Sequence, residues 1–199
     1  MVSKERGERV RSLWIKRTFT RFAVGSSIFL GYVGLIHISG ICAFTDGPSE
    51  YRVKAAFLYS FTKFVEWPPS SASNAKDPAN VCVLGENPFG GGLREILAGK
   101  TFNGRQFAVK ELTGTEEARG CLILFIGSPE RKRVKPMLQG LERASVLTIG
   151  DTQGFAEDGC VIDFMLEDNK LRFEINTAAA DRARLKISSK LLSLAKIVK

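Results

Sequence analysis

The longest helical pattern of apolar and polar residues in this chain runs through residues 53–66. At about 100° per residue, one largely apolar face collects Val53, Phe57, Ser60, Phe61 and Phe64. The opposite face collects Arg52, Thr62, Lys63 and Glu66. Such a pattern is typical of an amphipathic helix whose apolar face packs on a core. Because Pro68 cannot continue a helix, we expect this one to end near Glu66.

Apolar runs bounded by turn residues follow this helix and indicate buried strands. They lie at residues 81–84, 104–112, 121–126 and 144–149. Residues 160–165 and 170–175 flank a short polar turn and predict a β-hairpin. Strands interleaved with helices predict an α/β fold. We expect a three-layer sandwich in which a mixed β-sheet is flanked by helices on both faces.

Capping residues indicate where the later helices begin. The expected caps are Asn87, Ser128, Thr177 and either Ser188 or Ser189. Pro88 and Pro129 occupy favourable first-turn positions after two of them. The last helix is expected to carry an apolar stripe as far as Val198.

Lys54 interrupts the apolar face of the first helix, because the wheel places it between Phe61 and Val65. An unpaired buried ammonium is costly. The lysine therefore either reaches solvent, meets a core carboxylate, or contacts a ligand or partner. Tyr59 and Trp67 fall at the margin of the same face, where amphipathic aromatic residues serve either as the edge of a core or as interface residues.

The positive charge of the chain is concentrated at its start. Residues 1–43 carry a net charge of +5 out of +8, and residues 22–44 hold no charged side chain. A basic segment followed by an apolar one predicts a signal peptide cut after Ala43, with residues 44–199 exported. The alternative is an uncleaved anchor formed by residues 22–44. The nearly balanced remainder lacks the basic face that nucleic-acid binding requires.

Three cysteines remain after the predicted cleavage site, and an oxidising compartment favours one disulfide and one remaining thiol. Cys82 and Cys121 belong to two runs that read as strands, which could bring their sulfurs together if the strands are neighbours. For Cys160 we expect a buried, inert thiol, and the alternative is an exchange partner or redox sensor.

The residue types of the exported part do not form a catalytic constellation. The only histidine, His37, lies in the leader, which excludes histidine-based nucleophile pairs and zinc sites there. No C-x-x-C motif occurs, and no acidic pair has a spacing that argues for acid–base chemistry. The glycine-rich turn at residues 85–92 lacks the lysine of a P-loop and is expected to be a plain turn. We therefore expect no enzyme activity, no cofactor and no metal.

A family resemblance rests on five segments of the chain. They are VKAAFLYSFTKFVEWP at residues 53–68, VLGENPFG at 83–90, VLTIGD at 146–151 followed by GFA at 154–156, RFEIN at 172–176, and ISSKLL at 187–192. Together they resemble the YfiR family of periplasmic proteins over residues 51–198. The resemblance implies a disulfide between Cys82 and Cys121, whose loop of about 40 residues would stabilise the fold by roughly 3–4 kcal/mol.

The resemblance also implies a function. YfiR-like proteins are periplasmic repressors that hold the sensing domain of an inner-membrane diguanylate cyclase inactive, which lowers cyclic di-GMP and biofilm formation. An outer-membrane OmpA-like lipoprotein or loss of the disulfides relieves the repression, and a homodimer is a further expected partner. Our hypothesis for the partner-binding residues is the set Lys54, Tyr59, Lys63 and Trp67. The alternative function is a periplasmic small-ligand sensor that holds an anion at residues 85–92 with the help of nearby basic residues.

Overall fold

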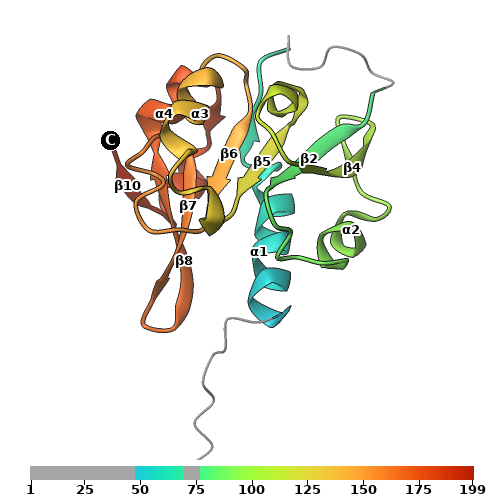
Figure 1. Cartoon of the computed structure of the whole chain (residues 1–199), viewed down its shortest axis with the longest axis horizontal. Helices are drawn as coiled ribbons and strands as arrows, with labels where there is room; N and C mark the ends of the chain where they lie inside the picture. Colours follow the sequence, from blue (N-terminus) through green and yellow to red (C-terminus); the bar gives the residue numbers. More distant parts are fainter. Residues whose placement is uncertain (1–47, 70–76) are drawn as a thin grey trace, which may run out of the picture. The chain divides into compact units, whose positions relative to one another are not determined.

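A computed structural model describes residues 48–69 and 77–199 of the chain (Figure 1). The predicted leader lies outside the described residues, and within them no helix is both long and apolar enough to cross a membrane. The helices are α1 (Pro48–Phe61), α2 (Gly92–Leu97), α3 (Val134–Gly140), α4 (Thr177–Arg182) and α5 (Ser189–Leu192), with short 3-10 segments η2 (Glu116–Gly120) and η3 (Ser128–Glu130). The strands are β1 (Val65–Glu66), β2 (Ala79–Leu84), β3 (Thr101–Phe102), β4 (Arg105–Leu112), β5 (Ile123–Ile126), β6 (Leu147–Gly150), β7 (Ile162–Glu167), β8 (Lys170–Asn176), β9 (Lys186–Ile187) and β10 (Lys196–Val198).

The main sheet has eight strands in the order β10-β8-β7-β6-β5-β2-β4-β3. Its five consecutive strands β7, β6, β5, β2 and β4 are parallel, while β8 runs antiparallel to β7 as the predicted hairpin. The central strand β5 is buried at every position, which is typical of a parallel strand covered on both faces. A separate two-stranded sheet pairs β1 with β9.

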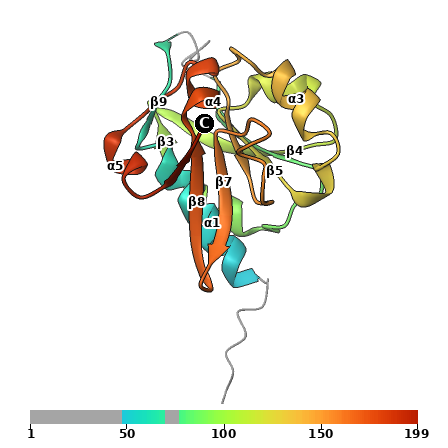
Figure 2. The ribbon, with the colours of Figure 1, turned by 90° about the vertical axis from the view of Figure 1, so that its left-hand side faces the viewer.

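Alternate residues of the strands enter two apolar cores, one on each face of the sheet. Val81 and Val83 of β2 join the core beneath α1 and α2, whereas Cys82 and Leu84 join the core beneath α3. Helices therefore flank the mixed sheet on both faces (Figures 1 and 2), and the predicted α/β sandwich is confirmed.

The predicted burial of the first helix is partly wrong. Phe61 is buried as predicted, but Val53 is 45% exposed, and Ala55 and Leu58, which the prediction did not place on the apolar face, are fully buried. The inward face is rotated because Glu50 and Lys54 also point inward and neutralise each other. A polar pair thus occupies part of the face that the apolar pattern assigned to hydrophobic residues.

The helix also ends earlier than predicted. It stops at Phe61 rather than near Glu66, and turns closed by i to i+3 hydrogen bonds follow it. Val65 and Glu66 then leave the helical path because they pair with Ile187 and Lys186 of β9. Long-range pairing overrides the local helical pattern here.

Three other boundaries also differ from the prediction. Helix α2 begins at Gly92, since the Asn87 side chain accepts from Phe89 in a preceding turn instead of capping the helix. The first segment after Ser128 is a 3-10 turn, and α3 begins only at Val134. The cap of α4 is Asn176, whose side chain accepts the Ala179 N–H at 2.7 Å.

The end of the chain is a strand where a continued helix was expected. Helix α5 is capped by Ser188, as predicted, but it stops at Leu192. Residues Lys196–Val198 form β10, which pairs in parallel with β8. Leu191 is buried and Leu192 and Ala195 pack against the core, but Leu194 is 69% exposed, so only part of the predicted apolar stripe faces the core.

Candidate functional site

Three of the predicted partner-binding residues lie in one surface cluster near the end of α1. We call this cluster the aromatic patch, which comprises Tyr59, Lys63, Trp67, Lys100, Phe102 and Phe107. Tyr59 lies on α1, Lys63 and Trp67 follow that helix, and Phe102 and Phe107 come from β3 and β4. The pairing of β3 with β4 at the end of the main sheet brings these distant segments together.

The rings of the aromatic patch contact one another edge to face. Tyr59 meets Phe107 with centroids 6.1 Å apart, and Trp67 meets Phe102 at 5.1 Å. Phe102 and Phe107 connect the two pairs at 6.5 Å. All four rings are half-buried and pack on the core that α1 covers. The patch is therefore a rigid apolar surface with exposed ring area.

Two ammonium groups lie against the central tyrosine of the patch. Lys63 Nζ is 4.6 Å and Lys100 Nζ 5.0 Å from the centroid of the Tyr59 ring, within the range of cation–π interactions. Lys63 is exposed, and the Lys100 ammonium donates to the carbonyl of Ile96. The patch thus combines aromatic area with positive charge, a combination that suits an acidic protein surface.

Lys54 does not belong to the aromatic patch. It is 5% exposed, and its ammonium is paired with Glu50 at 2.6 Å and Asp151 at 3.4 Å. Asp151 also accepts a hydrogen bond from the Tyr51 hydroxyl at 2.9 Å. Of the readings that the sequence left open, contact with core carboxylates is the one the structure shows. A role of Lys54 in partner binding remains a prediction.

Asp163 is a third buried carboxylate and lines the same cavity as Glu50 and Asp151. Burial raises its pKa from the ordinary 3.8 to about 7, and the Glu174 carboxylate on the neighbouring strand adds to the effect. The backbone N–H groups of Phe155 and Ala156 donate to Asp163 at 3.1 and 3.4 Å and act in the opposite direction. Burial prevails, so the carboxyl titrates near neutral pH.

The raised pKa of Asp163 makes stability depend on pH. The folded state binds the proton more tightly than the unfolded chain, so this stabilisation is fully present below pH 3.8 and is lost as pH rises through about 7. Between pH 5 and pH 7 the loss should be roughly 2 kcal/mol. Urea unfolding at several pH values should show it as a difference between wild type and Asp163→Asn. The exposed control Asp181→Asn should follow wild type, and a pH-independent difference for Asp163→Asn would contradict the assignment.

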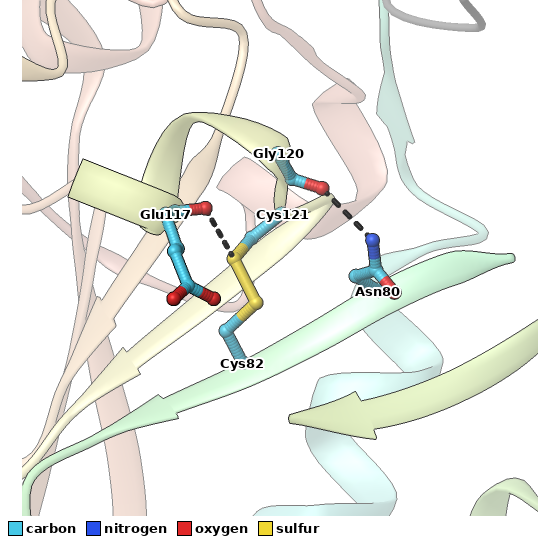
Figure 3. The surroundings of a disulfide bond; sticks show 5 residues. All are labelled: Asn80, Cys82, Glu117, Gly120 and Cys121. Atoms are coloured by element: carbon cyan, nitrogen blue, oxygen red, sulfur yellow. Dashed lines mark hydrogen bonds between the residues drawn. A yellow bond between two sulfur atoms is a disulfide. The ribbon is translucent and has the colours of Figure 1, made fainter. Parts of the chain in front are cut away.

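The predicted disulfide between Cys82 and Cys121 is confirmed (Figure 3). Cys82 lies within β2, Cys121 lies just before β5, and their Cα atoms are 6.0 Å apart. The Asn80 side chain donates to the carbonyl of Gly120 at 3.1 Å beside the bridge. The covalent bond thus joins β2 to the segment that enters its neighbouring strand.

Cys160 is a buried free thiol, as expected. Burial foremost, and then the carboxylates of Asp163 and Asp158, raise its pKa well above the ordinary value. The thiolate is the reactive form of cysteine. The structure therefore favours the inert role over exchange or redox sensing.

The glycine-rich turn offers little to an anion. Gly85 has φ +82°, and a Cβ there would come within 3.0 Å of the Glu130 carboxylate. The Glu130 carboxylate, which is paired with Arg133 at 2.6 Å, therefore occupies the space against the turn. The anion site that the sensor alternative placed at residues 85–92 gains no support from this geometry.

Comparison with known proteins identifies the family. A family model described as YfiR/HmsC-like matches residues 51–196. This chain belongs to the YfiR/HmsC-like family. The match covers the aromatic patch, Lys54, Asp151 and both bridged cysteines, and Glu50 lies one residue before it. No protein among the curated ones matches the sequence.

Two solved structures superpose on this chain with low sequence identity. A conserved domain protein from Vibrio cholerae O1 biovar El Tor superposes with a TM-score of 0.51 and 10% identity, covering 75% of this chain and 60% of that one. The ABC domain in complex with L-Trp from Streptococcus pneumonia reaches a TM-score of 0.45 with 9% identity over 60% of this chain and 55% of that one. This chain therefore matches somewhat more than half the length of each.

The sequence analysis did not identify several residues of the aromatic patch and of the ion pairs around Lys54. Glu50 could have been found, because it stands four residues before Lys54 and such a pair adjoins on a helix. Asp151 directly follows β6, and polar residues at the carboxyl ends of parallel strands often line sites. Phe102 and Phe107 carried no signal, because only the strand pairing brings them to Tyr59 and Trp67.

Proposed function

We propose that this chain is a periplasmic negative regulator that binds the periplasmic sensing domain of an inner-membrane diguanylate cyclase and holds it inactive, lowering cyclic di-GMP. Membership of the YfiR/HmsC-like family, which is regulatory, supports this proposal. The disulfide between Cys82 and Cys121 supports an oxidising compartment such as the periplasm.

The observation that carries the proposal is the aromatic patch. Interface residues that dominate binding energy are enriched in tryptophan, tyrosine and arginine on a preorganised surface. Tyr59 and Trp67 meet this description, because both are half-buried and are held by ring contacts with Phe107 and Phe102. Binding then orders few additional side chains, which lowers its entropic cost.

Regulation by this surface requires only differential binding. A cyclase domain that interconverts between an active and an inactive conformation shifts toward the form that the regulator binds more tightly. A preference of about 10⁴-fold moves a population from 99% active to 99% inactive. An outer-membrane OmpA-like lipoprotein that sequesters the regulator would reverse the shift by mass action. The proposal is also compatible with a homodimer of this chain.

The proposal predicts which substitutions weaken binding. Tyr59→Ala removes a central ring and should lower affinity for the cyclase's periplasmic domain by about 10- to 100-fold. Lys63→Glu reverses an exposed charge and should lower it by about tenfold, chiefly through a slower association rate. Titration calorimetry and surface-binding kinetics with the protein purified from the periplasm would measure both quantities.

The matched control is Lys132→Glu, because Lys132 is an exposed lysine on the other face of the sheet, just before α3. It makes the same charge reversal away from the aromatic patch and should leave affinity within about twofold of wild type. Circular dichroism should confirm that every variant is folded. If folded Tyr59→Ala and Lys63→Glu bind as tightly as wild type, the patch is not the interface.

A further inference from the structure

A cavity separates the start of α1 from the β7–β8 hairpin. The hairpin extends from the sheet in the same direction as the N-terminal part of α1 (Figures 1 and 2). Between them lies a cavity of about 410 Å³, within the range of small-molecule sites. Its floor includes Ser128, Asp151 and Gln153, which follow the carboxyl ends of β5 and β6. Ligands of open α/β sheets bind at this edge.

The charged residues that line the cavity are mostly acidic. The lining includes four carboxylates, Glu50, Asp151, Asp163 and Glu174, and two ammonium groups. Lys54 is paired with two of the acids, and the second lysine, Lys196, donates to Glu174 at 2.6 Å. Glu50, Asp151 and Glu174 are thus paired with the two lysines, and the fourth acid, Asp163, is partly protonated at neutral pH because its pKa is raised to about 7.

The strongest observation concerns single oxygen atoms of three of these acids. Glu50 Oε2, Asp151 Oδ1 and Asp163 Oδ1 are buried, and none has a hydrogen-bond donor among residues 48–69 and 77–199. Glu50 is 3% and Asp163 2% exposed. The side chain of Asp151 is 4% exposed. An ionised carboxylate can only accept, so the oxygens of Glu50 and Asp151 each need a donor that the described residues do not supply.

The cavity lining also has an apolar part, beside the polar Ser128 and Gln153. This apolar wall consists of Phe164, Met165, Leu166 and Leu171 of the hairpin, whereas Glu50 and Lys54 come from α1. A bare metal ion would leave this wall without a partner, and among the described residues no group of three or more acids, histidines or cysteines is arranged to hold one. An organic cation meets both requirements, because its ammonium group donates and its carbon body packs on the wall.

We propose that this cavity binds a small organic ammonium ion, with the ammonium directed to Glu50 and Asp151 and the apolar body against the β7–β8 hairpin. The inference rests on the cavity alone and holds whether or not the chain binds a cyclase. It retains a ligand-sensing role but replaces the anion of the sequence-based alternative with a cation. Glu50 and Lys54 of the cavity lining lie on α1, and Tyr59 of the aromatic patch lies on the same helix.

The test uses three probes with similar bodies and different charge. Calorimetric titration of the purified full chain with 2-phenylethylammonium should show saturable binding at least tenfold tighter than with the neutral 2-phenylethanol. The anionic 3-phenylpropionate should bind no better than the alcohol. Magnesium and calcium chloride should not compete with the ammonium probe.

Variants locate the binding to the cavity. Asp151→Asn keeps the shape but removes a charge, and it should weaken binding of the ammonium probe at least tenfold, whereas the exposed control Asp181→Asn should not. Leu166 is 49% exposed, so Leu166→Lys places a competing ammonium at the cavity without disturbing the buried acids. It should also weaken binding at least tenfold, and it remains informative if Asp151→Asn does not fold. No saturable binding of the ammonium probe, equal affinity for the alcohol, or unchanged affinity in Leu166→Lys would overturn the proposal.

Discussion

Lys54→Met is expected to destabilise the folded domain by about 3–5 kcal/mol at neutral pH. The substitution keeps the length of the side chain but removes the ammonium that lies 2.6 Å from Glu50 and 3.4 Å from Asp151. Two buried carboxylates then face each other without a counter-charge, and an uncompensated buried charge is among the costliest single changes in a protein. Urea unfolding followed by circular dichroism measures the loss.

The charge explanation can be separated from simple packing. Lys132→Met makes the same change at an exposed site and should alter stability by no more than about 0.5 kcal/mol. Adding Glu50→Gln and Asp151→Asn to Lys54→Met should recover most of the lost stability, because a buried ion pair and a neutral replacement are often of similar stability. If the free energy of unfolding of Lys54→Met lies within about 1 kcal/mol of the wild-type value, the Lys54 ammonium does not stabilise the fold by neutralising Glu50 and Asp151.

Loss of the disulfide should cost about as much. Replacing both Cys82 and Cys121 with alanine opens a bridge that spans 39 residues, and the chain-entropy model gives about 3–4 kcal/mol for a loop of that length. The bridge connects β2 with the segment leading into β5, at the centre of the parallel sheet. Its loss should therefore lower the midpoint of urea unfolding of the whole domain.

Reduction provides an internal control for this prediction. Dithiothreitol should lower the stability of wild type toward that of the double variant and should leave the double variant unchanged. Cys160→Ala keeps the bridge, so this variant should remain sensitive to the reductant. Equal stability of wild type and the double variant would contradict the predicted contribution.

The fold class could be predicted because the six longest strands of the main sheet, β2 and β4 to β8, are marked locally. The run at residues 121–126 is apolar throughout, which is how a doubly covered parallel strand appears in a sequence. Strand order could not be predicted, since the pairing of β2 with both β4 and β5 is tertiary. Strand β10 itself was missed, because its residues continue the helical pattern of α5 and only its pairing with β8 makes it a strand.

The candidate sites were predictable only in part. The margin of the helical wheel correctly indicated that Tyr59 and Trp67 are half-buried. The sequence also showed that Lys54 interrupts an apolar face, but Asp151, its second partner, lies 97 residues away along the chain. Contacts across such a separation depend on the fold as a whole. Helical periodicity therefore identified the residues of α1 and not the surfaces they form.

Photo-crosslinking in the native cell tests the central claim most directly. A photo-crosslinking amino acid in place of the exposed Lys63 should capture an inner-membrane protein that mass spectrometry identifies as a diguanylate cyclase. The same amino acid in place of Lys132, on the opposite face, should not capture it. Failure to capture a cyclase at position 63, or equal capture at both positions, would contradict the account.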